Sequence, residues 1–294
     1  MPAIDADLAI VCFIIGVALI FDFINGFHDS ANAIATIVST RVLSPKYAVL
    51  WAAFFNFVAA FVIQMGVASV IAKTLTPEVS TKEVVLAALL GAIAWNLITW
   101  YFGIPSSSSH ALIGGLVGAG LAAGGFSPSV VQWSAVQMPL IGIVLAPTLC
   151  LVLGFIFMLL ILWICRSWHP SPLNKVFKKL QLVSSAVYSV SHGGNDAQKT
   201  IGVICVLLVS QGFIKPTGEN GHLASADVPF WVIGSAFLAI SLGTSDTVFG
   251  FMPEPLVDES GTGHVFGSPT GGFMGITVFR NGSPVSLGLT ALAD

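Results

Sequence analysis

SHGGNDAQKT, residues 191–200, interrupts a long apolar stretch with a histidine, an asparagine, an aspartate and a lysine. Charged side chains are costly in the interior of a membrane, so their presence at that depth marks an ion or substrate pathway. We expect the pair Gly193-Gly194 to let the backbone leave the helix at this point. Asp196 would then cap a new helix over residues 197–213.

A second segment, NGFHDSANA at residues 25–33, has the same order of glycine, spacer, polar residue and aspartate. The correspondence pairs Gly26 with Gly193, His28 with Asn195 and Asp29 with Asp196. Apolar runs flank this copy as well. Two polar breaks at corresponding places in two halves of a membrane protein are typical of the central binding site of a transporter.

The composition excludes most classes of soluble protein. Of the 294 residues, 55% are hydrophobic and 9% are charged, and the mean hydropathy is +0.91. These values predict an all-α polytopic protein in a lipid bilayer. The net charge of −3 and the lack of a basic stripe argue against nucleic acid as a partner. The cysteines have no metal-ligand spacing, and we interpret them as small buried hydrophobic residues: Cys12, Cys150, Cys165 and Cys205.

Apolar runs predict the membrane segments, two of which carry the polar breaks: residues 8–40, 47–72, 84–101, 111–123, 138–165, 179–215 and 230–242. The basic segment 166–179 belongs in the cytoplasm by the positive-inside rule. Counting the membrane segments outward from it, the segment with the polar residues 25–33 crosses from outside to inside. The segment with the polar residues 191–200 crosses from inside to outside. We therefore expect two inverted-topology repeats with broken helices, in a multi-pass protein of the plasma membrane.

By composition the chain has four parts. We expect a first transmembrane repeat with a serine-rich hairpin at residues 1–165, a basic cytoplasmic loop at 166–180, the start of a second, inverted repeat at 181–244 and a tail at 245–294. The tail is rich in glycine, proline and acidic residues, and it has no run long enough to span a bilayer. We expect it to lie outside the membrane.

A run of serines follows Pro105 and precedes the apolar run 111–123. Because proline breaks a helix, we expect a re-entrant hairpin that places the serines on the first turn of the next helix. Free backbone N–H groups and the positive end of the helix dipole make such a turn a site for a tetrahedral oxyanion such as phosphate or sulfate. The alternative is a serine-rich cap in a short external loop. The residues are Ser106, Ser107, Ser108 and Ser109.

Carboxylates inside a membrane suit a hard cation or a proton. Asp29 and Asp196 are the first candidates for cation or proton coupling and Asp22 is the third, the alternative being that Asp29 and Asp196 only cap helices. Lys199 lies three residues after Asp196 and can pair with it across one turn. Neutral ligands or proton carriers are expected among further polar residues, each of which has a purely structural alternative: Asn25, His28, Asn32, His110, His192 and Asn195.

Three segments, residues 24–33, 104–110 and 191–199, together resemble the motifs of the inorganic phosphate transporter (Pit/PiT) family. The resemblance is closest to the bacterial low-affinity branch, which carries the Phe-His-Asp found here at residues 27–29. It extends over residues 8–244. Three motifs in the expected order make it specific.

This resemblance implies symport of inorganic phosphate with a cation, a proton rather than sodium, across the bacterial inner membrane. It also implies that phosphate travels either free or as a complex with a divalent metal. It implies no resident cofactor and does not identify any metal ligands. Assembly of the chain into homo-oligomers is compatible with the resemblance. Carried over, the serines at 106–109 contact phosphate. The coupling site is then lined by Asp29 and Asp196 together with Asn25, Asn32 and Asn195.

The chain departs from the family after Thr244. A second hairpin rich in serine and threonine, preceded by proline and ending in Thr-Thr-His, is expected there, and only residues 284–286 echo it. We interpret the tail as the result of a frameshift or a truncation that leaves the C-terminal half incomplete. The alternatives to phosphate symport are a truncated protein that does not transport, an anion channel, or an intramembrane serine hydrolase with His110 as base.

Overall fold

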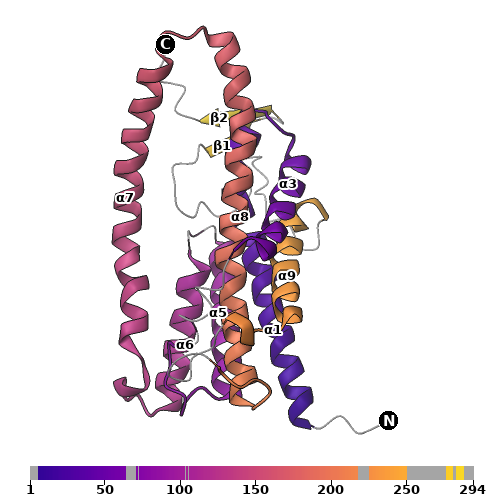
Figure 1. Cartoon of the computed structure of the whole chain (residues 1–294), viewed down its shortest axis with the longest axis vertical. Coiled ribbons are helices and arrows are strands. Elements are labelled where there is room, and N and C mark those ends of the chain that lie inside the picture. Colours follow the sequence, from indigo (N-terminus) through magenta and orange to yellow (C-terminus); the bar gives the residue numbers. More distant parts are fainter. Residues whose placement is uncertain are drawn as a thin grey trace.

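The computed structural model shows a bundle of helices (Figure 1). It describes residues 6–63, 71, 73–102, 104, 106–217, 225–249, 276–280 and 283–287. The α-helices are α1 (Ala6–His28), α2 (Ser30–Ser39), α3 (Pro45–Val58), α5 (Lys82–Tyr101), α6 (Ser108–Ala123), α7 (Trp133–Cys165), α8 (Pro170–Ser210) and α9 (Phe230–Phe249). Short 3-10 turns are η1 (Ala59–Phe61), η2 (Pro128–Val130) and η4 (Ser225–Asp227). Two tail strands, β1 (Ile276–Arg280) and β2 (Ser283–Leu287), pair antiparallel with Ile276 opposite Leu287.

Long apolar helices dominate the described part of the chain. Three spans are long and apolar enough to cross a membrane: residues 6–39, 82–101 and 133–165. Shorter apolar helices cover residues 45–61, 108–123 and 230–246. These spans confirm the prediction of an all-α multi-pass membrane protein, with the two short tail strands as the exception. A helix satisfies its backbone polar groups within its own segment, which a lipid bilayer requires.

The core forms where α1, α5, α8 and α9 meet. Helix α1 packs against α9 and α5, while α8 packs against α3, α1 and α9. The largest buried side chains there include Phe21 on α1, Leu89 on α5, Ile204 on α8 and Phe237 on α9. Segments that are far apart in the chain therefore enclose one common interior, and the polar residues of α1 and α8 lie within it.

The break predicted at Gly193-Gly194 is wrong. Helix α8 is continuous from Pro170 to Ser210, and Asp196 lies in its middle instead of capping a new helix. Gly193 instead permits close packing against α3, since a Cβ there would lie 2.7 Å from the backbone oxygen of Asn56. Gly26 makes the equivalent approach to the backbone of α9 at Ile240.

The first break is a single residue. Helix α1 continues to His28, and α2 begins at Ser30. Asp29 between them has φ −100° and ψ 3° and makes no capping hydrogen bond with its side chain. Its backbone N–H still donates to the carbonyl of Asn25 at 3.1 Å. The two helices therefore follow each other closely, and the expectation that Asp29 caps a helix through its carboxylate is also wrong.

Three predicted boundaries differ from the structure. Helix α3 ends at Val58 and continues as a 3-10 turn to residue 61, while residues 64–70 and 72 of the predicted span lie outside the described residues. The basic segment is a short turn followed by helix, because α8 begins at Pro170 with proline in the favoured first turn. Helix α9 passes the expected boundary at 244 and continues to Phe249.

Helix α7 stands apart from the bundle along most of its length (Figure 1). Its most apolar window has no buried residue within the described structure. A helix that is apolar all round suits contact with lipid. The prediction of a membrane span at residues 138–165 is therefore supported, although the helix begins earlier, at Trp133.

Candidate functional site

The serines begin helix α6, as predicted. Ser107 is the N-cap, and its side chain accepts a hydrogen bond from the backbone N–H of His110 at 3.5 Å. The hydroxyl of Ser106 accepts a hydrogen bond from the indole N–H of Trp95 on α5 at 3.0 Å. Pro105, which was expected to break the preceding helix, lies outside the described residues. The first turn of α6 thus presents hydroxyls and free N–H groups together.

A chain of hydrogen bonds leads from this turn to the middle of α8. The hydroxyl of Ser108 donates to the side-chain oxygen Oδ1 of Asn25 at 2.5 Å. The amide nitrogen Nδ2 of Asn25 then donates to Oδ2 of Asp196 at 3.0 Å. All three residues are buried. Residues on three helices, α6, α1 and α8, therefore share one network.

Asp196 also forms a buried ion pair. Nζ of Lys199 lies 2.6 Å from Oδ1 of Asp196, and the two side chains are 5% and 12% exposed. A charge is tolerated in such surroundings only when it is paired and hydrogen-bonded. The prediction that Lys199 pairs with Asp196 across one turn is confirmed.

Two histidines and a second aspartate lie beside this pair. Nδ1 of His192 lies 3.7 Å from Oδ2 of Asp196, and Nδ1 of His28 lies 3.4 Å from Oδ1 of Asp29. One ligand atom from each of Asp29, His192 and Asp196 lies within 4.8 Å of the other two. Two carboxylates and an imidazole can hold a divalent cation of the first transition row.

Asp22 is a further carboxylate beside this cluster. Its side chain is fully buried, and neither carboxylate oxygen has a hydrogen-bond partner among the described residues. Asn25 and Thr200 lie close to it without reaching hydrogen-bond geometry, and Asp196 and Lys199 are within electrostatic range. A buried carboxylate without a partner becomes stable when it takes up a proton or a cation.

Other buried polar atoms in the described part of the chain also lack a partner. They include Nε2 of His28 and His192, Oδ1 of Asn56, the amide of Asn96, and the hydroxyls of Ser189 and Thr200. Native interiors rarely leave such groups unpaired unless water, an ion or a substrate completes them. Several belong to the same helices as the ion pair, so the interior of the bundle is suited to a polar ligand.

Two predicted residues lie elsewhere. Asn195 is exposed, because in a continuous helix it is turned about 100° away from Asp196. The structure therefore does not bring Asn195 to Asp196, and its place in the coupling site stays a prediction. His110 is also exposed, and its Nε2 contacts the backbone oxygen of Pro139 on α7 at 3.3 Å. Asn32 is half-buried, one turn after Asp29.

Sequence reasoning missed several buried polar residues. Asn56 on α3 donates to the hydroxyl of Thr244 on α9 at 2.8 Å, and that hydroxyl lies 3.2 Å from the carbonyl of Gly26. Asp246 is 3% exposed and belongs to α9, although it was assigned to the tail. A polar residue at the end of the apolar run from Phe230 was the signal that could have found it.

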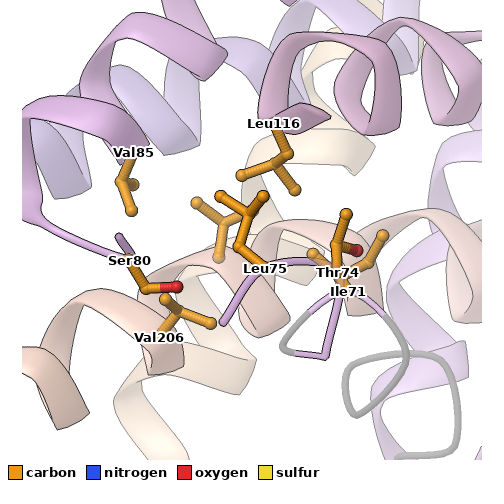
Figure 2. Close-up of a pocket in the computed structure, with 8 residues that line it drawn as sticks. Ile71, Thr74, Leu75, Ser80, Val85, Leu116 and Val206 are labelled. Carbon is orange, nitrogen blue, oxygen red and sulfur yellow. The ribbon is translucent and has the colours of Figure 1, made fainter. Parts of the chain in front are cut away.

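A separate cavity lies away from this cluster. Figure 2 shows Val85 of α5, Leu116 of α6 and Val206 of α8 around it. Thr74 and Leu75, from the segment that precedes α5, also line it. Its lining is mostly aliphatic and includes none of the polar residues described above. We therefore interpret it as a packing gap and not as the binding site.

Known proteins match the chain over most of its length. Residues 25–248 match the model of the phosphate transporter family, PHO4. A protein of Rhizobium meliloti (strain 1021), named "Probable low-affinity inorganic phosphate transporter", is 51% identical over 243 residues, which cover 82% of this chain and 70% of that protein. One of the same name in Bacillus subtilis (strain 168) is 43% identical over 244 residues, with the same shares of each chain.

A solved structure entitled "The sodium-dependent phosphate transporter" shares the fold, with a TM-score of 0.69 over 85% of this chain and 79% of that one. At 20% identity this likeness concerns the fold alone. The matching family and relatives are transporters and not enzymes, so the serine-hydrolase alternative is wrong. The family match and the two close relatives show that this chain belongs to the phosphate transporter family.

Proposed function

We propose that the protein carries inorganic phosphate across the bacterial inner membrane together with a cation. The observation that carries this proposal is the hydrogen-bond chain from Ser108 through Asn25 to Asp196. It joins a helix N-terminus suited to an anion with a buried carboxylate suited to a cation. The names of the relatives point to the same substrate.

The serine turn is the proposed phosphate site. Hydroxyl groups and backbone N–H groups at the start of α6 offer neutral donors to the phosphate oxygens. The hydrogen-bond partners of Ser106, Ser107 and Ser108 among the described residues are Trp95, His110 and Asn25, and none is an arginine. Neutral donors hold an oxyanion less strongly than a bidentate guanidinium does. A transporter needs such a site because it must also release its substrate.

The coupling step would act through Asn25. While Asp196 is ionised, it holds the amide of Asn25, which in turn holds the hydroxyl of Ser108. When a proton neutralises Asp196, its charge-assisted bonds to Asn25 and to the Lys199 ammonium weaken, and the Ser108 hydroxyl becomes free to turn toward phosphate. Cation binding and phosphate binding would therefore favour each other.

We propose a proton as the coupling ion. The unpartnered carboxylate of Asp22 and the imidazoles of His28 and His192 are groups that can take up a proton inside the bundle. A divalent metal travelling with phosphate would find ligands at Asp29, His192 and Asp196, provided that the Lys199 ammonium first moves away from Asp196. It would be cargo and not a resident ion.

The packing supports the two inverted repeats. Gly26, in the first copy, meets α9 of the second copy, and Gly193, its counterpart, meets α3 of the first. Each copy therefore contributes a glycine contact to the other. We propose that this exchange places the two aspartates in one central site, as in transporters built from inverted repeats. Assembly into homo-oligomers stays a prediction.

Radiolabelled phosphate uptake into proteoliposomes tests the proposal. We expect uptake driven by an imposed proton gradient and not by a sodium gradient. Asp196→Asn should lower the rate at least tenfold, because it removes the charge that a cation must neutralise. Asp7→Asn is the matched control, since Asp7 forms an exposed ion pair with Lys82 and should behave as the wild type.

The other outcomes separate the alternatives. Unaltered uptake by Asp196→Asn would count against coupling at this carboxylate. Flux that persists without any cation gradient would identify an anion channel. Folded, membrane-inserted wild-type protein that takes up no phosphate would favour the truncated protein that does not transport.

A further inference from the structure

Lys199 is a buried cation that the proposed mechanism does not use. Its ammonium lies 2.6 Å from the carboxylate of Asp196, with a side chain only 5% exposed. Burying a lysine costs free energy that this one ion pair has to offset. A protein that needed only a helix at this position would be more stable with an apolar residue, so the charge itself requires an explanation.

The internal repeat of the sequence supplies a comparison. Asp29 corresponds to Asp196, so the residue three places later is Asn32 in the first copy and Lys199 in the second. An asparagine oxygen is a neutral ligand for a hard cation beside a carboxylate. A lysine brings a positive charge of its own to the same place. In the first copy a cation beside Asp29 would have to come from the solvent. In the second copy the Lys199 side chain itself is the cation beside Asp196.

The groups around Lys199 fit this role. Asp22 from α1 is within electrostatic range, and Asp196 holds the ammonium directly. Nδ1 of His192 on α8 lies 3.7 Å from the other carboxylate oxygen of Asp196, Oδ2. A mobile sodium ion placed at Asp196 would lie within a few ångströms of the ammonium and would be strongly repelled in this low-dielectric interior.

We propose that Lys199 is a tethered cation. Its ammonium occupies the place of a monovalent ion at Asp196, the aspartate of the second copy, and so excludes sodium from this carboxylate. This inference deepens the proposed function, because it concerns which ions the same site accepts. Lys199 acts here as a specificity-determining residue. Sodium is expected to bind at Asp196 once the ammonium is replaced by the asparagine of the first copy.

Sodium binding to purified protein tests the inference without any transport step. The variant is Lys199→Asn, which copies Asn32. Binding of radioactive sodium and thermal unfolding in sodium chloride against choline chloride are the readouts. We expect Lys199→Asn to bind one more sodium ion per chain than the wild type does. We also expect sodium to raise its melting temperature by about 4 °C more than that of the wild type.

Two further variants complete the design. Lys82→Asn removes a half-buried lysine that pairs with the exposed Asp7, away from Asp196, and it should match the wild type in sodium binding. Asp196→Asn combined with Lys199→Asn removes both charges, and it should fold without gaining a sodium site. Because neither readout involves phosphate, a wild-type protein that fails to take up phosphate leaves this test intact.

Three results would overturn the inference. One is a folded Lys199→Asn variant that binds no more sodium than the wild type. Another is a gain of sodium binding that persists in the double variant, since sodium would then not be held by Asp196. The third is a Lys199→Asn variant that stays unfolded at every sodium concentration while the double variant folds, because sodium could not then replace the ammonium.

Discussion

At the scale of single residues, Asn25 is the link between the two ends of the proposed site. Its carbonyl oxygen accepts from Ser108, and its amide nitrogen donates to Asp196. A carboxamide can do both at once, whereas an ionised aspartate has no hydrogen to donate. The asparagine at this position is therefore explained by its two different partners.

Asn25→Ala should break the link at both ends. We expect a loss of about 1–3 kcal/mol in the free energy of unfolding, because a buried hydroxyl and a buried carboxylate each lose a partner. Phosphate uptake should fall at least tenfold. Asn195→Ala is the matched control, since Asn195 is exposed, and it should change stability by less than about 0.5 kcal/mol. Equal effects of the two substitutions would show that the network is not used.

Local rules predicted part of the site from the sequence. The serines begin a helix after a proline, and Lys199 pairs with Asp196 across one helical turn. The bond between Asn25 and Asp196 joins residues 171 positions apart, and no local rule contains that information. The direction of the Asn195 side chain was not predictable for a related reason, because it depends on whether the helix is continuous.

At the scale of helices, the apolar runs predict where helices lie but not what their glycines do. The pair at 193–194 was interpreted as a break, since glycine is conformationally free. In the structure Gly193 lies where α8 touches the backbone of α3. Glycine allows both a break and a close approach, and only the position of the neighbouring helix decides between them.

Gly193→Ala tests this interpretation. The added methyl group would lie 2.7 Å from the backbone oxygen of Asn56, so α8 and α3 would have to separate. We expect a loss of about 1–3 kcal/mol in the free energy of unfolding. Gly142→Ala on α7 is the control, because nothing lies within 4 Å of its Cβ position. That control should be neutral or slightly stabilising. Equal melting temperatures for the two variants would contradict the packing role.

At the scale of the whole molecule, the direction of each helix fixes the topology. Figure 1 shows the start of α1 at the opposite end of the bundle from the turn between α7 and α8. That turn and the first turns of α8 carry the basic residues Arg166, Lys175, Lys178 and Lys179. The positive-inside rule therefore predicts that the start of α1 lies on the outer side.

Labelling of single cysteines tests this topology. In a chain whose native cysteines have been replaced, Ser129→Cys should react with a membrane-impermeant maleimide in intact cells. Ser167→Cys should react only in inverted membrane vesicles. Both positions are exposed, and α7 separates them. Reaction of both from the same side would show that α7 does not cross the bilayer.

The unbroken course of α8 has a mechanical consequence. A continuous helix moves as one rigid body, and the close contact of Gly193 with Asn56 is the point about which α8 would tilt. The distance from this contact to the end of the helix at Pro170 is about 35 Å along the axis. A tilt of roughly ten degrees at Asp196 would therefore swing the basic end of α8 by about 6 Å. An event at one carboxylate in the interior would thus be amplified into a displacement at the cytoplasmic surface.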